Sequence, residues 1–476
     1  MHAAIAAISV VVILWLAMRG LSDPFYGLLA FMAAYEIQPG ELYPPLAILH
    51  LERVLGLVLV VSFAAHHCRL RFPPVTRWLL AFYGAMLAST LFAFWRSNSV
   101  MADVAFLEIV LYHLMLVALL HRKEQIRKVV VLMIGLVAWL GGSAVWDYLH
   151  GVRDFTMGID RAVGLTSSAG DADSLALTMV AAMPLMFLLM VKGNSKPTRL
   201  YALACFSIAL VTVVSTGART AFFAFLLLMF MLVFRKKQNL KFLPALVVAL
   251  PLFWIAIPQQ YKLRYESVKS RDHDESYTDR LLSWQGGVQM FLHNPLTGVG
   301  PNNYTDANGE KYWPVQPRVY LNAHSLYFIT IGELGLLGVI TFGGYVFVLL
   351  RLNRSLAKRY RDPADEDRVI AGFGGACTLT VILLLFAGYS GHDLYRTTWY
   401  SFGAISAAVA LYRSEEAKAE VSAPAEAAPR HRVPAWSPDF GSLGPSSAAP
   451  WAPVAETMPP GAKLALVESA PREITT

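Results

Sequence analysis

Long apolar runs constrain the fold of this chain more than any other feature of its sequence. Most are roughly 16–25 residues long, which matches the roughly 20 helical residues that cross a bilayer. No run alternates like a barrel strand, and a helix satisfies every backbone amide within its own segment. We therefore predict an all-α polytopic integral membrane protein with about 12–13 transmembrane helices. The predicted spans are 3–18, 25–37, 46–65, 78–94, 104–120, 129–149, 174–191, 200–215, 220–234, 242–258, 325–351, 369–390 and 398–412.

The composition excludes an ordinary soluble enzyme. Of the 476 residues, 56% are hydrophobic and 15% are charged, whereas soluble domains carry about 25% charged residues. The net charge of +7 resides in the loops between spans, so we expect no nucleic-acid partner. Three scattered cysteines, Cys68, Cys205 and Cys377, form neither a disulfide framework nor a CxxC metal site.

Lysine and arginine predict the orientation of the spans. One set of alternate loops holds 21 basic residues, and the short loops on the other side hold five. Cytoplasmic loops carry the basic excess, so the first set is predicted to be cytoplasmic and the long loop 259–324 periplasmic. The basic set comprises Arg19 and the loops 66–77, 121–128, 192–199, 235–241 and 351–368.

The chain is predicted to consist of a transmembrane domain with one large loop, followed by a tail. Residues 1–413 form the transmembrane domain, and its large periplasmic loop (259–324) carries one amphipathic segment, 276–293. The apolar residues of that segment fall on one helical face, which predicts a helix lying on the membrane surface. They are Leu281, Trp284, Val288 and Phe291 or Leu292. Residues 414–476 are rich in Ala, Pro, Ser and Glu, which predicts a disordered cytoplasmic tail.

Charged residues inside the spans gather toward the predicted outer side. Ionisable side chains within a membrane are costly and usually functional, so this asymmetry predicts a wet cavity that opens outward. An alternative is that Glu52 and Arg53 compensate each other or extend toward the interface. The outer-half residues are Glu52, Arg53, Glu108, Asp147 and Glu333.

The external loops add cations and a histidine. Arg219 lies in the tight turn STGART (215–220), whose small polar residues and following helix favour anion binding. Arginine also binds phosphate in a bidentate manner, although Arg219 could instead be an interfacial arginine that extends toward water. His324 directly precedes the span 325–351, where a histidine is either structural or a proton acceptor near neutral pH.

Several segments together resemble the O-antigen ligase and polymerase superfamily of bacterial membrane glycosyltransferases. The resemblance covers roughly residues 150–340, and the segment 23–40 is loosely similar to the branch that accompanies exosortase systems. The chain departs from the family at Asp173 and Ser325, where asparagine is common. The segments are DRAVGLTSSAGDADSLALTMVAAMP (160–184), STGART (215–220), Arg280 with Trp284 and PLTGVGPNNY (295–304), and NAHSLYFITIGELGLLG (322–338).

The resemblance implies a metal-independent, inverting transferase that needs no cofactor. Its donor would be an oligosaccharide on undecaprenyl pyrophosphate at the periplasmic face of the inner membrane. Its acceptor would be a hydroxyl of lipid A core, of a second glycan or of a protein. Membrane lipids and polysaccharide assembly proteins are the further expected partners. The predicted catalytic residues are His324, Arg280 and Arg219, and the predicted substrate-binding residues are Arg161, Arg318, Tyr304 and Glu333.

Two other functions remain open on the sequence. A flippase for lipid-linked glycans would show repeated halves and polar groups through the full membrane depth, neither of which the chain shows. A non-catalytic scaffold of a polysaccharide assembly complex would explain the tail but not the external arginines and histidine.

Overall fold

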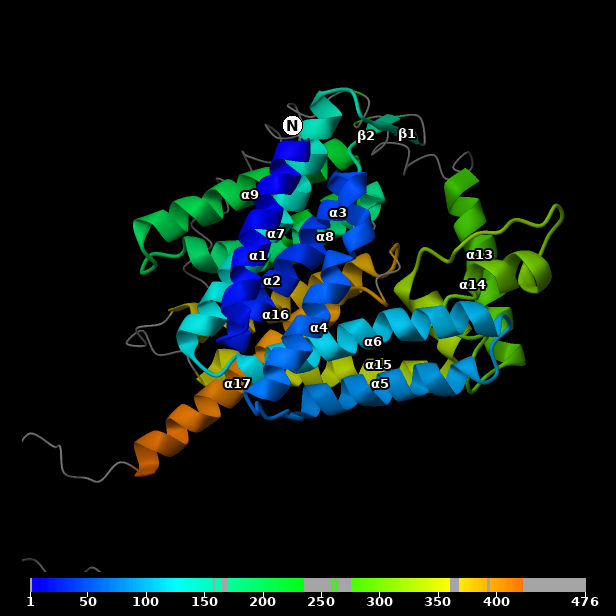
Figure 1. Ribbon diagram of the computed structural model, residues 1–476. Coiled ribbons are helices and arrows are strands. Elements are labelled where there is room, and N and C mark those ends of the chain that lie inside the picture. Colours follow the sequence, from blue (N-terminus) through cyan, green and yellow to red (C-terminus); the bar gives the residue numbers. More distant parts are fainter. Residues whose placement is uncertain are drawn as a thin grey trace, which may run out of the picture. The chain divides into compact units, whose positions relative to one another are not determined.

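The computed structural model describes residues 2–156, 159–164, 170–234, 275–359, 368–391 and 394–422, with 259 and 262 as single residues. Most of these residues are helical (Figure 1). The one sheet among them is the antiparallel hairpin of β1 (Asp154–Thr156) and β2 (Ile159–Arg161). The predicted span 242–258 lies outside the described residues.

Each of the other predicted spans coincides with a helix. Seven segments among the described residues are long and apolar enough to cross a membrane, while Ala6–Gly20 and α10 are shorter apolar helices. The all-α polytopic class is therefore confirmed, whereas the count of 12–13 spans remains a prediction. The helices are α1 (His2–Gly20), α2 (Pro24–Ile37), α4 (Leu51–Ala65), α5 (Pro74–Thr90), α6 (Arg96–Leu119), α7 (Lys123–Leu149), α8 (Ala172–Met190), α9 (Lys196–Thr216), α10 (Arg219–Phe234), α15 (Leu326–Arg359), α16 (Arg368–Ala387) and α17 (Thr397–Ser422).

Shorter elements lie between these helices. Helix α3 (Pro39–Leu42) and the 3₁₀ turn η1 (Pro44–Leu49) connect α2 to α4. The predicted surface segment forms α13 (Glu275–His293), and α14 (Tyr304–Ala307) and the π-helical turn η6 (Asn308–Tyr312) follow it.

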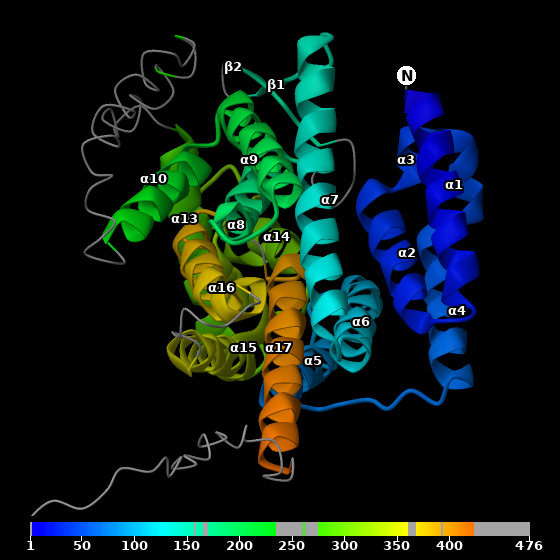
Figure 2. The same cartoon turned by 90° about the vertical axis from the view of Figure 1, so that its left-hand side faces the viewer.

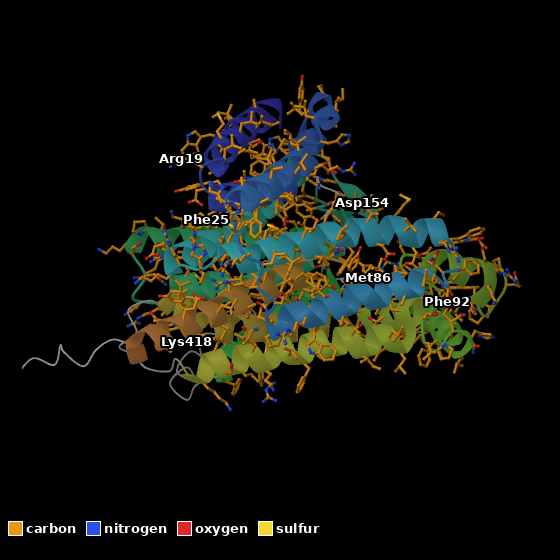
Figure 3. The ribbon with its side chains drawn as sticks, turned by 60° about the horizontal axis from the view of Figure 1, so that its bottom comes forward. Arg19, Phe25, Met86, Phe92, Asp154 and Lys418 are labelled. Carbon is orange, nitrogen blue, oxygen red and sulfur yellow. The ribbon has the colours of Figure 1, made fainter. Side chains whose placement is uncertain are left out.

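Two apolar clusters hold the described helices together. The larger one joins α1, α2 and α4 to α6, α7, α8, α9, α10, α16 and α17, and the smaller one joins α5, α6, α15, α16 and α17 to the loop after α13 (Figure 2). Lipid tails are as apolar as leucine, so close packing rather than water exclusion holds such helices together. Figure 3 shows Arg19 and Lys418 toward one end of the helices, and Phe92 and Asp154 toward the other. This arrangement agrees with the predicted alternation of loops.

Helix α15 is interrupted at Gly335, and a loop fills the interruption. Gly335 has φ 56° and ψ −149°, a conformation essentially reserved for glycine. The amides of Leu336 and Leu337 bond to the carbonyls of Pro295 and Leu296 at 2.8 and 3.1 Å. In return, the amides of Val299 and Gly300 bond to carbonyls of α15 at 2.9 Å. The motifs PLTGVG and GELG are thus the two halves of one backbone junction.

The structure adds two details to the sequence predictions. Ser283 and Met290 of α13 are buried, whereas Val288 and Leu292 of its predicted apolar face are 38% and 62% exposed. Helix α17 continues to Ser422, beyond residue 414 where the predicted tail begins, and residues 423–476 lie outside the described residues.

A cysteine-labelling experiment can test the predicted sides of the membrane. Val315 and Ser355 are both exposed, and they lie in predicted periplasmic and cytoplasmic loops, respectively. In a Cys68→Ala background, Val315→Cys should react with an impermeant maleimide once the outer membrane is permeabilised. Ser355→Cys should react after the inner membrane is opened. The reverse order of labelling would contradict the predicted orientation.

The junction at Gly335 predicts a matched pair of stability measurements. A Cβ at Gly335 would lie 2.7 Å from the Leu296 carbonyl carbon, whereas one at Gly343 would meet nothing within 4 Å. Gly335→Ala should therefore lower the free energy of unfolding by at least roughly 1–3 kcal/mol, the usual cost of such backbone strain. Gly343→Ala should leave the thermal midpoint in detergent nearly unchanged. Equal midpoints for the two variants would contradict the junction.

Candidate functional site

The short segment after α16, residues 388–391, connects the elements that carry the predicted catalytic residues; we call it the connector. The Gly388 carbonyl accepts hydrogen bonds from the Ser325 hydroxyl at 3.3 Å and from the Leu326 amide at 2.8 Å. These two bonds hold the start of α15 directly after His324.

Ser390 of the connector joins the two elements that carry Arg219 and Arg280. Its hydroxyl oxygen accepts a hydrogen bond from the Thr220 hydroxyl and another from Arg280 Nη1, both at 2.8 Å. Thr220 directly follows Arg219 in the first turn of α10, whereas Arg280 belongs to α13. One serine therefore brings together two arginine-bearing elements that are about 60 residues apart in the sequence.

The turn that presents Arg219 is built by the end of α9. Gly217 takes the left-handed conformation (φ 59°) that closes a helix, and its amide donates to the Val214 carbonyl at 3.1 Å. Arg219 then begins α10 and is half-buried. A half-buried guanidinium at a helix start places a positive charge beside the positive end of the helix dipole, which suits an anionic ligand.

Arg161, the last residue of β2, hydrogen-bonds to this turn. It is 4% exposed, and its Nε donates to the Thr216 carbonyl at 2.7 Å. Its Nη2 forms an ion pair with Asp173 at 2.7 Å. Because both ends of the guanidinium already bond to the chain, the structure gives Arg161 a positioning role beside Arg219. Direct substrate binding by Arg161 remains a prediction.

A second ion pair lies at the same helix end. Asp171 caps α8 by accepting from the Ser174 amide at 2.8 Å. Arg396, just before α17, donates to the Asp171 carboxylate at 3.3 Å and to the Ser174 hydroxyl at 2.6 Å. The start of α8 therefore holds one arginine from the hairpin and one from the segment before α17.

His324 has an unusual backbone conformation. Its φ of 45° lies in the left-handed region, where non-glycine residues are uncommon and often functional. Its amide donates to Asn322 Oδ1 at 3.2 Å, and the preceding carbonyl of Ala323 accepts from Trp284 Nε1 at 2.8 Å. Because Trp284 lies one turn after Arg280 on α13, this bond brings His324 close to the helix that carries Arg280. Its side chain is half-buried.

Tyr304 and Glu333 lie in a buried polar network. The Tyr304 hydroxyl donates to the Ser283 carbonyl at 2.6 Å. The Glu333 carboxylate accepts from the Tyr304 amide at 3.1 Å and from the Tyr395 hydroxyl at 2.6 Å. Burial, together with the Glu333 charge, raises the pKa of Tyr395 well above its ordinary value, so this hydroxyl stays protonated and donates. Both residues thus hold the framework, and their contact with substrate remains a prediction.

Arg318 lies apart from this network. Its side chain is exposed, and its Nη1 donates to the Glu310 carbonyl. The described residues contain no group of three or more His, Cys, Asp or Glu side chains that could hold a metal ion.

The sequence analysis missed Ser390 and Arg396. Residue 390 was assigned to the end of the predicted span 369–390, but α16 ends at Ala387 and leaves Ser390 in the connector. The run GYSG (388–391) was the available signal, because glycine commonly directly follows the last turn of a helix.

The fold and the site define a polytopic membrane protein in which arginines and a histidine gather at one end of its helices. Residues 203–343, from α9 to α15, match the family model described as O-antigen ligase. This match supports the resemblance of that region to the O-antigen ligase and polymerase superfamily of membrane glycosyltransferases. The matched region contains Arg219, Arg280 and His324, whereas Arg161 and the connector lie outside it. Among curated proteins, none matches the chain.

The connector predicts that Ser390 is needed for full activity. Ser390→Ala removes the acceptor of Arg280 and Thr220, and a hydrogen bond to a charged group contributes about 1.5–3 kcal/mol. Glycan transfer by the purified protein should fall roughly 10- to 100-fold, while Ser390→Thr, which keeps the hydroxyl, should retain most of it. Ser207→Ala is the matched control, because that hydroxyl bonds only the carbonyl one turn earlier in its own helix. Unchanged transfer by Ser390→Ala would contradict this role.

Proposed function

We propose that this protein transfers a glycan from undecaprenyl pyrophosphate to an acceptor hydroxyl at the periplasmic face of the inner membrane. In this reaction the acceptor oxygen bonds to the anomeric carbon of the first sugar. The bond from that carbon to the pyrophosphate oxygen breaks, and its electron pair leaves with undecaprenyl pyrophosphate. The configuration at the anomeric carbon inverts because the acceptor attacks the face opposite the leaving group.

Arg219 and Arg280 are proposed to stabilise the leaving pyrophosphate. Negative charge develops on it as the bond breaks, and preorganised cations placed there lower the barrier. The observation that carries the proposal is the shared bonding of Thr220 and Arg280 to Ser390, which brings the two arginine-bearing elements to one point. Arginine also pairs with two phosphate oxygens at once, which suits a pyrophosphate better than lysine does.

His324 is proposed to accept the proton of the acceptor hydroxyl. Histidine is suited to this role because its ordinary pKa lies near neutral pH. The bonds from Gly388 to the start of α15 keep His324 close to the connector, and therefore close to Ser390 and Arg280. The proton would move from the acceptor oxygen to the imidazole as the new glycosidic bond forms.

The two roles predict different kinetic defects. His324→Ala should leave donor binding nearly intact but lower transfer by roughly 10²–10⁴-fold, the usual contribution of a general base. Arg219→Lys and Arg280→Lys should weaken both donor binding and turnover, because a point charge does not replace a bidentate fork. The measurements are donor binding and single-turnover transfer with purified protein in lipid nanodiscs.

Matched controls are available elsewhere in the chain. His293 ends α13 and is exposed, and Arg354 is exposed on α15 beyond its break. His293→Ala and Arg354→Lys should behave like the wild type in both measurements. Near-normal transfer by His324→Ala would remove it as the base. Wild-type protein that binds the donor and moves it across the bilayer without transferring its glycan would instead favour a flippase.

A further inference from the structure

Tyr389 lies between the two proposed halves of the reaction. The preceding residue, Gly388, bonds to the start of α15 next to His324. The following residue, Ser390, bonds to Arg280 and to Thr220 beside Arg219. Because both neighbours are fixed by hydrogen bonds, the backbone of Tyr389 is fixed between the proposed base and the proposed pyrophosphate site.

The side chain of Tyr389 is exposed. It is 57% exposed, and its hydroxyl bonds no partner among the described residues. Two nearby tyrosines differ, because the Tyr327 hydroxyl donates to the Leu385 carbonyl and the Tyr395 hydroxyl donates to Glu333. Tyr389 therefore offers an aromatic ring and a hydroxyl that the fold itself does not use.

A rigid aromatic pair supports the Tyr389 ring. Trp284 meets it edge-to-face with ring centroids 5.2 Å apart. Trp284 is itself stacked on Phe328 at 4.9 Å with an interplanar angle of 9°, and its Nε1 donates to the Ala323 carbonyl. The Tyr389 ring is therefore oriented by packing and not by its hydroxyl.

We propose that Tyr389 is the platform on which the first pyranose ring of the donor stacks, an inference that rests on the proposed function. In a transfer between the two arginines and His324, the anomeric carbon must lie between pyrophosphate and base, which is where Tyr389 is fixed. A pyranose presents a face of C–H groups that fits an aromatic ring, and its hydroxyls can bond the tyrosine hydroxyl. The platform would select the ring shape of the sugar independently of the pyrophosphate.

An exposed tyrosine at a helix end could alternatively be an interfacial aromatic of the membrane. Phe386 on the preceding turn of α16 is 43% exposed and provides the matched comparison. An interfacial role predicts that Tyr389 and Phe386 behave alike on substitution, with no dependence on the sugar. A sugar platform predicts that they differ, with the difference confined to sugar-bearing ligands.

The experiment compares the binding of two lipids to the purified full-length protein in nanodiscs. One is undecaprenyl pyrophosphate, and the other is the same lipid carrying a single N-acetylglucosamine. Tyr389→Leu should weaken binding of the sugar-bearing lipid roughly 3- to 10-fold, the range that an aromatic ring contact contributes, and leave undecaprenyl pyrophosphate unchanged. Tyr389→Phe should retain most of the affinity, and Phe386→Leu should change neither.

Arg280→Lys separates this inference from the proposed function, because it should weaken both lipids equally. Unchanged binding of the sugar-bearing lipid by Tyr389→Leu would overturn the platform and leave the pyrophosphate site standing. Equal loss of both lipids in Tyr389→Leu would also overturn it, because the substitution would then act on the shared framework. Wild-type protein that binds neither lipid would overturn the proposed function, and the platform with it.

Discussion

The need to satisfy every backbone amide within a membrane determines how this site is built. A helix that crosses hydrocarbon can break only where another segment supplies the missing partners. Helix α15 breaks at Gly335, and the loop 295–300 supplies them through four backbone bonds. The Ser89 hydroxyl of α5 adds a bond to the Glu333 carbonyl at 2.9 Å. This junction ties α5 and the loop after α13 to the helix that begins just after His324.

The candidate site is assembled from helix ends. Arg219 begins α10, His324 lies two residues before the start of α15, and Ser390 follows α16. Helix ends leave backbone groups unsatisfied, and they are the places where a chain in a membrane can expose polar groups to water. Charges placed there can meet a lipid-linked anion without being buried in hydrocarbon. The family match and the convergence on Ser390 together support glycan transfer as the activity.

The arginine side chains of the site differ in their bonding partners. Arg161 and Arg396 form ion pairs with Asp173 and Asp171 at the two sides of the start of α8. Arg280 bonds the hydroxyl of Ser390, which also accepts from Thr220 beside Arg219. The two ion pairs support the interpretation of Arg161 and Arg396 as positioning residues at the start of α8.

The sequence alone determined the helical class, the approximate position of each described span and the resemblance to a family, because spans and motifs are local patterns of apolar and polar residues. It also predicted Arg219, Arg280 and His324 as a set. It could not reveal Ser390, because the contacts of this serine join residues about 110 and 170 positions away. It likewise could not show which side of α13 packs on the protein, where Ser283 and Met290 are buried while Val288 and Leu292 are exposed. Periodicity marks an apolar side, but in a membrane both lipid and protein accept apolar residues, so only tertiary packing decides which side meets the protein.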